Sequence, residues 1–306
     1  MLREHIIFRE PFGIDTKSMI ERPTPKAFRP PETNATVAML PLVRDAAKQW
    51  RAGWCTYPDG FDENPDIEIF CGGENEKMAR AAACWRQGNL LHFGFEQSPA
   101  EMNESGQRLL LNSIAYISRF TEDRPIAVTP SVFGGSVAYP RAYLDRRLGE
   151  KGDAGDAAWL LSDRTLEQLK PLSRDDVRRW HAEHRPYLHP GADLKLEVDE
   201  DARALVAPID RVEFFDKTIA ALRRDGKDAL RASSLLARYA PTEVAGHDSA
   251  SAWEKWLKEN RSYLFFSDQG DYRWYVDPLA RKRGTRSAEL RGPMRASNAF
   301  LTTQRR

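Results

Sequence analysis

The stretch LLHFGFEQSPAEMNESGQRLLLNSIAYI, Leu90–Ile117, decides the fold of the first half of the chain. An apolar run ends at Phe95, and a helix start follows. Ser98 is a good N-cap, Pro99 suits the first helical position, and Glu101 completes a capping box. Apolar residues then recur at helical spacing at Met102, Leu109, Leu110, Ile114 and Ile117. The stretch predicts a buried strand, a capped turn and an amphipathic helix.

Strand patterns precede this stretch. DIEIF, residues 66–70, alternates as a strand does, and RAAACWRQGNLLHFGF, residues 80–95, predicts a hairpin that turns near Gly88 and Asn89. Gly106 lies inside the predicted helix, where it costs about 1 kcal/mol relative to alanine. We expect close packing of the helix on the sheet to compensate for that cost.

The second half of the chain contains two similar segments. WHAEHRPYLHPGADLKLEVDEDAR begins at Trp180 and WLKENRSYLFFSDQGDYRWYVDPLAR begins at Trp256, about 76 residues later. The matched pairs are Trp180 with Trp256, Glu183 with Glu259, Arg185 with Arg261, Tyr187 with Tyr263, Leu188 with Leu264 and, after a two-residue difference in length, Val198 with Val276, Asp199 with Asp277, Ala202 with Ala280 and Arg203 with Arg281. This agreement predicts a duplicated helix–hairpin–helix module, stacked as in a short helical repeat array.

The predicted organisation is α+β with three parts. Residues 1–127 form a partial α/β region, residues 128–172 a turn-rich linker, and residues 173–306 a mainly helical domain with the two modules and a basic tail. The length suits about two domains with hydrophobic cores of their own.

Composition excludes several classes of protein. The formal net charge is +1, with 41% apolar and 30% charged residues, so nothing predicts binding to nucleic acid. The apolar run near Met1 is too short for a signal peptide or a membrane span, which predicts a soluble, cytoplasmic protein without membrane contact. Cys55, Cys71 and Cys84 have no CxxC spacing, so we expect neither a disulfide framework nor a thiolate zinc site.

The segment Gly72–Phe120 resembles the C-terminal end of the class I glutamine amidotransferase-like fold, including its ThuA-like branch. Members end with a hairpin, a tight turn and a closing helix, in which an aromatic residue, His-Pro-Glu, a Gly and Leu-Leu-x-Asn-Phe follow in order. The residues that fit are Phe95, Gly106, Leu109, Leu110 and Asn112. The chain as a whole is similar to planctomycete-type proteins with ThuA-like regions. The resemblance implies an incomplete flavodoxin-like α/β fold and a link to carbohydrate metabolism.

The chain departs from this family at its catalytic positions. The family's histidine and glutamate would fall on Glu96 and Ser98, and no Gly-x-Cys-x-Gly nucleophile turn is found in the sequence. Too few strand–helix alternations precede residue 66 for a complete parallel sheet. The region is therefore either a degenerate remnant or the tail of a longer protein read from an internal Met1, which would be exported if its precursor is.

His92 and Glu96 are the candidate catalytic pair. They lie four residues apart at the end of the predicted last strand, where an open α/β sheet places its functional crevice. An ionisable pair beside an apolar wall can act as acid and base. The alternative is a solvent-facing Glu96 and a hydrogen-bonded edge histidine.

Two groups are candidate metal ligands. His181 and His184, with His189 nearby, have a spacing that suits zinc, and Asp268 and Asp271 flank a glycine turn that could offer oxygens to calcium. The alternatives are a solvated helix end and a hairpin turn, because the second module has Leu257, Asn260 and Phe265 where the first has its histidines.

Two functions remain open at this point. The first is a binding or accessory protein, with a protein partner or a small-molecule or carbohydrate ligand, lacking amidotransferase chemistry. The second is a hydrolase of a small ester, lactone or glycosidic substrate that uses Glu96 and His92, or a loosely bound divalent metal such as calcium or zinc. Fold analogy alone does not choose between them.

Overall fold

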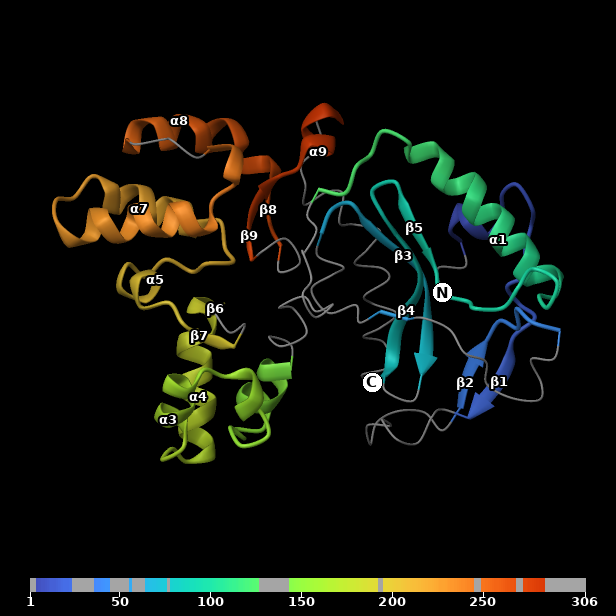
Figure 1. The fold of residues 1–306 in the computed structure, drawn as a ribbon, viewed down its shortest axis with the longest axis horizontal. Coiled ribbons are helices and arrows are strands. Elements are labelled where there is room, and N and C mark those ends of the chain that lie inside the picture. Colours follow the sequence, from blue (N-terminus) through green and yellow to red (C-terminus); the bar gives the residue numbers. More distant parts are fainter. Residues whose placement is uncertain are drawn as a thin grey trace. The chain divides into compact units, whose positions relative to one another are not determined.

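The computed structural model describes residues 4–23, 36–44, 55–56, 64–75, 78–126, 143–191, 195–244, 249–267 and 272–283. These residues belong to two compact units. The first lies within residues 1–126, and the second holds residues 127–289 together with Asn64. Both units contain helices and strands, so the chain is α+β, as the sequence predicts (Figure 1).

The first unit is built around an antiparallel sheet of three strands. They pair in the order β3 (Ile67–Asn75), β4 (Met78–Gln87) and β5 (Leu90–Phe93), and a separate hairpin joins β1 (Ile20–Pro23) to β2 (Thr36–Met39). The short helix η1 spans Ile6–Phe8, α1 spans Glu104–Ile117, and η4 spans Ser118–Phe120. The predicted hairpin at Gly88 is confirmed, and Gly88 has a positive φ of 55°.

Helix α1 begins later than the sequence predicts. Ser98 and Glu101 do bond to each other, with Ser98 N donating to Glu101 Oε2 at 3.0 Å, but they form a turn before the helix. The N-cap is Asn103, whose side-chain oxygen accepts from Gly106 N at 2.9 Å. The reason is that Met102 forms a β-bridge with Val43, which holds this part of the chain in an extended form.

Gly106 is needed for a close approach of α1 to another segment. A Cβ atom there would lie 2.2 Å from the carbonyl oxygen of Leu42. The expected close packing is present, but the partner is the chain at Leu42. The buried side of α1 consists of Gly106, Leu109, Asn112, Ser113 and Tyr116.

The second unit includes the whole of the predicted linker. Of residues 128–172, those from 143 onward contain the π-helix η5 (Asp145–Glu150), η6 (Ala158–Leu160) and α3 (Asp163–Leu169). Leu144, Leu148 and Leu161 are completely buried. The prediction of a linker therefore fails for residues 143–172, because their leucines fill a hydrophobic core.

The two similar segments have the same order of elements. The first module contains α4 (Arg174–His184), η7 (Arg185–Tyr187), β6 (Leu188–Pro190), β7 (Leu196–Val198) and α5 (Glu200–Ala204). The second contains α8 (Ala250–Asn260), η9 (Arg261–Tyr263), β8 (Leu264–Ser267), β9 (Arg273–Val276) and α9 (Pro278–Arg283). Between them lie α6 (Glu213–Leu222), α7 (Lys227–Tyr239) and η8 (Thr242–Val244).

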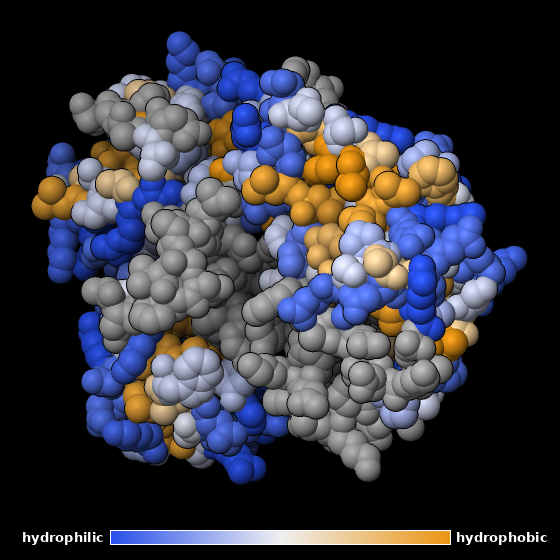
Figure 2. Space-filling model, turned by 45° about the vertical axis from the view of Figure 1, so that its right-hand side comes forward, coloured by the Kyte–Doolittle hydropathy of each residue, from blue (hydrophilic) through white to orange (hydrophobic). Residues whose placement is uncertain are grey.

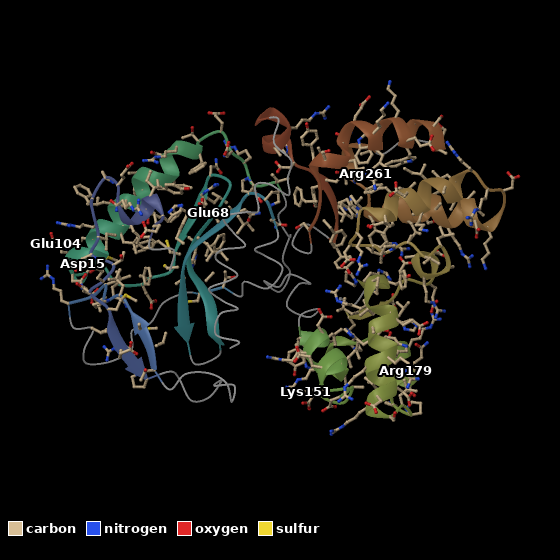
Figure 3. All side chains as sticks on the ribbon, turned by 180° about the vertical axis from the view of Figure 1, so that it is seen from behind. Asp15, Glu68, Glu104, Lys151, Arg179 and Arg261 are labelled. Carbon is tan, nitrogen blue, oxygen red and sulfur yellow. The ribbon has the colours of Figure 1, made fainter. Side chains whose placement is uncertain are left out.

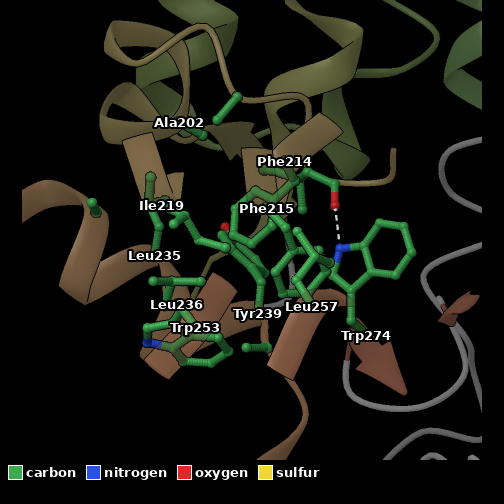
Figure 4. Close-up of a cluster of buried hydrophobic side chains, with 14 of the residues drawn as sticks. Ala202, Phe214, Phe215, Ile219, Leu235, Leu236, Tyr239, Trp253, Leu257 and Trp274 are labelled. Atoms are coloured by element: carbon green, nitrogen blue, oxygen red, sulfur yellow. Dashed lines mark hydrogen bonds between the residues drawn. The ribbon is translucent and has the colours of Figure 1, made fainter. Parts of the chain in front are cut away.

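The helix and hairpin of each module enter different hydrophobic cores, although α5 of the first module contributes Ala202 to the core of the second. The first module packs against η5, η6 and α3 around Leu144, Leu161 and Leu196. The second packs against α6 and α7 around Phe215, Tyr239 and Trp253, as Figure 4 shows. Trp274 of β9 is part of this core, and its indole nitrogen donates to Ile209 O at 2.8 Å.

Candidate functional site

The candidate catalytic residues His92 and Glu96 lie in different surroundings. His92 is in β5, opposite Trp85 of β4, and its ring stacks on the indole with centroids 5.3 Å apart and an interplanar angle of 22°. Glu96 follows the end of β5 and is exposed. All pairs of named strands in the described part of the first unit are antiparallel. The crevice at the carboxyl ends of parallel strands, on which the candidate pair depended, is therefore not found in these residues.

His184 serves as a structural link inside the first module. Its Nδ1 lies 2.8 Å from Trp180 O, which fixes that nitrogen as the donor, and Nε2 faces the Arg203 guanidinium at 3.3 Å. Its ring also stacks on Trp180 with centroids 4.6 Å apart. Both ring nitrogens are therefore engaged, so a metal would have to displace existing contacts.

The second module has the same link without histidine. Asn260 donates from Nδ2 to Trp256 O at 2.8 Å and accepts from Arg281 at 3.1 Å. Histidine and asparagine thus perform the same task at equivalent positions. This correspondence favours the structural interpretation of His184.

His181 faces another partner. It is buried, and its Nε2 lies 3.1 Å from Asp145 Oδ1, while Arg185 donates to both oxygens of Asp145 at 2.9 and 3.1 Å. Burial would raise the pKa of Asp145, but the close contact with His181 and the hydrogen bonds and charge of Arg185 outweigh it and lower the pKa to about 2. His181 of α4 and Arg185 of η7 together anchor the start of the π-helix η5.

The remaining metal candidates give no ligand set. His189 lies on β6 opposite Glu197, with its Nε2 3.7 Å from the carboxylate, and burial lowers its pKa. Asp268 and Asp271 fall outside the described residues. Within the part of the chain that the structure describes, no group of three or more His, Cys, Asp or Glu residues is arranged to hold a metal ion.

A partly buried carboxylate that sequence reasoning missed joins the elements of the first unit. Glu68 of β3, which is labelled in Figure 3, accepts hydrogen bonds from His5, Arg86 and Tyr116, each at 2.8 Å. His5 accepts from Ile7 N through Nδ1, so the proton that it shares with Glu68 is on Nε2. These residues come from the N-terminal segment, two strands and α1, so no local pattern could have identified the cluster.

The electrostatics of this cluster favour an ionised Glu68. Burial would raise the pKa of Glu68, but the His5 hydrogen bond and the Arg86 charge outweigh it and lower the pKa to about 2. Burial, together with the nearby carboxylate, raises the pKa of Tyr116. Both Glu68 oxygens are thus engaged by donors of the fold itself, which is typical of a structural junction.

A similar junction organises the second unit. Asp199 is almost fully buried, and one of its oxygens accepts from Arg238 at 2.5 Å and from Tyr239 at 2.7 Å. The other oxygen caps α5 through Asp201 N and Ala202 N, both at 3.0 Å. Burial and the negative charge of Asp199 raise the pKa of the Tyr239 hydroxyl. The cluster ties the first module to α7.

The most unusual surface in the first unit is the outward side of α1. We call Leu110, Leu111, Ile114 and Ile117 the α1 outer face. Leu111 is 49% exposed and Ile114 is 58% exposed, while Leu110 and Ile117 are half-buried. Figure 2, which turns this side of the molecule forward, shows hydrophobic side chains gathered there. The sequence predicts one apolar face that contains Met102, Leu109, Leu110, Ile114 and Ile117. Met102 and Leu109 are buried, but Ile114 is exposed, because Gly106, Leu109, Asn112, Ser113 and Tyr116 form the buried side of α1 instead.

No family model, no curated protein and no solved structure matches the chain. In the described residues, no helix is both long and apolar enough to cross a membrane.

Proposed function

We propose that this protein is a binding or accessory protein that contacts its partner through the α1 outer face. The observation that carries the proposal is the exposure of Leu111 and Ile114 on a helix whose other side is already packed on its sheet. A surface helix normally has polar residues on its solvent side. Contiguous apolar residues exposed there mark contact sites.

The clusters of buried ionisable residues are consistent with this role. Glu68 and Asp199 each accept several hydrogen bonds from residues that hold the fold together. His184 is matched by Asn260 in the second module. The alternative hydrolase receives less support, because His92 packs its ring on Trp85 and Glu96 faces solvent.

The proposal also concerns the evolutionary origin of the two units. The hairpin β4–β5, the turn and α1 follow in the order expected for a remnant of the amidotransferase-like fold. The common element order of the two modules supports a duplication in the second unit. The link to carbohydrate metabolism comes only from the ThuA-like resemblance and is part of the same proposal.

Two measurements test the proposed function. Purified protein is assayed with chromogenic esters, lactones and glycosides, with and without a chelator, next to His92→Ala and Glu96→Gln. We expect no turnover by the wild-type protein; turnover that both substitutions abolish would overturn the proposal in favour of the hydrolase.

The second measurement examines the surface itself. A photo-crosslinking residue replaces Leu111, and the matched control replaces Leu230 of α7, which is 72% exposed. We expect crosslinked adducts in cells from position 111 and not from position 230. Equal yields of adduct from both positions would show that the α1 outer face has no special role.

A further inference from the structure

We propose that Cys71 and Cys84 are a reversible oxidation site, at which hydrogen peroxide joins the two thiols in a disulfide between β3 and β4. A dithiol is the reductant that restores the thiols. The site lies in the core of the first unit, so it is independent of the α1 outer face and of the function proposed for that surface.

The sheet places the two cysteines opposite each other. Cys71 of β3 and Cys84 of β4 are partners in the antiparallel register. The Cβ atoms of such partners are about 4.5–5.5 Å apart, and a disulfide needs about 3.5–4.5 Å. The register is irregular on both sides of Cys71, so the strand can adjust there locally. The two thiols already interact, since the Cys84 thiol donates a hydrogen bond to the Cys71 sulfur.

All three cysteines of the chain gather in one hydrophobic core. Cys71 and Cys84 belong to the cluster that also contains Leu109 of α1, and Cys55 packs against it. The Sγ atom of Cys55 lies 2.7 Å from the position that a Cβ atom on Gly73 would occupy. All three are free thiols in this structure. The disulfide would therefore form in the core that α1 covers, with a third thiol close by.

The surroundings of the two thiols determine which of them reacts first. The hydrogen bond from Cys84 lowers the pKa of Cys71, and the same bond together with burial raises the pKa of Cys84. The thiolate is the form that attacks an oxidant. Cys71 is also the more accessible of the two, at 9% exposed against 0% for Cys84. Hydrogen peroxide, which is small and neutral, therefore reacts with Cys71.

Cys55 is not expected to form part of the disulfide. It is half-buried, and burial raises the pKa of its thiol. It also has no cysteine opposite it, because the neighbouring Thr56 pairs with Ala82 of β4. Cys55 therefore provides an internal comparison for the other two thiols.

The reaction has two steps. The Cys71 thiolate attacks one oxygen of hydrogen peroxide, the O–O bond breaks, and the hydroxide that leaves takes up the proton lost by Cys71 to become water. The Cys84 sulfur then attacks the sulfur of the Cys71 sulfenic acid. The S–S bond forms, the S–O bond breaks, and the hydroxyl leaves as a second water with the Cys84 proton. Two thiols are oxidised and one peroxide is reduced.

Thiol counting on the full chain tests the proposal. The folded protein is treated with hydrogen peroxide, the peroxide is removed, and free thiols are counted in denaturant with a chromogenic disulfide. We expect the count to fall from the three thiols of the sequence to one, and to return to three with dithiothreitol. Peptide mapping without reduction should find Cys71 linked to Cys84 and Cys55 free.

Variants separate the roles of the three thiols. The matched control Cys55→Ser should form the same disulfide at the wild-type rate. Cys84→Ala should stop at the sulfenic acid of Cys71, which dimedone traps. Cys71→Ala should lose the Cys84 thiol at least about tenfold more slowly than the wild-type protein does. Circular dichroism verifies that each variant is folded.

The wild-type protein alone can overturn the proposal, whether or not the variants fold. Three thiols that persist under peroxide would show that Cys71 and Cys84 are only small core residues. A disulfide that contains Cys55, or a sulfinic acid at Cys71 without a disulfide, would show that Cys84 does not react with the oxidised Cys71.

Discussion

The two modules of the second unit share their internal joints. In each, the backbone N–H of an aspartate donates to a tyrosine carbonyl at 2.8 Å, from Asp199 to Tyr187 and from Asp277 to Tyr263. The same aspartate side chain then caps the helix that follows its hairpin. These residues are among those that recur in the sequence. Recurrence therefore marks the contacts that each module needs for its own shape.

The modules differ at the positions that face their surroundings. Leu196 of the first hairpin enters the core with Leu161, whereas Trp274, its equivalent, enters the core with Phe215. The equivalent arginines also pair with different carboxylates. Arg185 pairs with Asp145 of η5, and Arg261 pairs with Asp216 of α6. The same order of helices and strands therefore packs against two different cores. The residues that differ between the modules are the ones that contact these cores.

The largest difference in stability between the two modules should come from replacing the aspartate that caps the helix after each hairpin. Asp199→Ala deprives Arg238 and Tyr239 of their common acceptor in addition to uncapping α5. We expect a loss of about 2–3 kcal/mol in the free energy of unfolding, because α5 loses its cap and the buried Tyr239 hydroxyl loses a charged acceptor, while the half-exposed Arg238 can turn to solvent. Asp277→Ala, at the equivalent position, should cost about 1–2 kcal/mol, as for an N-cap. Urea denaturation at neutral pH measures both.

Asp199→Asn serves as the control for that comparison. Asparagine keeps an acceptor for the cap but removes the charge that faces Arg238. We expect a loss between those of the two alanine variants. Equal losses for Asp199→Ala and Asp277→Ala would show that the additional bonds of Asp199 do not stabilise the fold.

Replacing His184 by asparagine should lower the free energy of unfolding by less. His184→Asn should cost less than about 1 kcal/mol, because Asn260 makes the corresponding bonds in the second module. His184→Leu leaves Trp180 O and Arg203 without this partner and should cost about 1–3 kcal/mol. Asn260→Leu is the matched control in the other module. Thermal unfolding provides the comparison.

The same variants address zinc. We expect zinc to change the melting temperature of the wild-type protein no more than that of His184→Asn. A rise confined to the wild-type protein would support the zinc site that the histidine spacing suggests and would contradict the structural role of His184.

Local patterns predicted those parts of the fold that depend on local bonds. The hairpin at Gly88 follows from turn chemistry and strand alternation, and the common element order of the modules follows from recurring residues. The predicted start of α1 was wrong because Met102 forms a β-bridge with Val43, which is far away in the sequence. The N-cap is therefore Asn103. Periodicity also could not show which side of α1 faces the sheet, because apolar residues occur on both sides.

The candidate sites were harder to predict for the same reason. Spacing identified His181 and His184, but their partners decide their roles, and Asp145 lies on an element that the sequence did not predict. No sequence pattern identified Glu68, because its partners His5 and Tyr116 lie at opposite ends of the first unit's sequence. Buried polar junctions depend on contacts that only the folded chain reveals.

The smallest expected difference between the modules concerns the acids that pair with Arg185 and Arg261. The pKa of Asp145 is about 2, below its usual 3.8, because the contact with His181 and the hydrogen bonds from Arg185 outweigh the effect of burial. The folded state therefore favours the ionised acid, and the resulting stability is present above pH 3.8 and is lost as the pH falls through 2. The pKa of Asp216 is also lowered, by its hydrogen bond from Arg261.

Both acids are more than one third exposed, so solvent screening keeps each contribution below about 1 kcal/mol. We expect Asp145→Asn to cost more than Asp216→Asn at pH 7, because Asp145 has His181 as a second partner. The difference should be smaller at pH 3, because Asp145 of the unfolded chain, with its usual pKa of 3.8, is then largely protonated. Urea unfolding of the three proteins at pH 7, 5 and 3 measures it. A cost of Asp145→Asn that stays constant across this range would mean that packing around η5, and not the charge of Asp145, distinguishes the first module from the second.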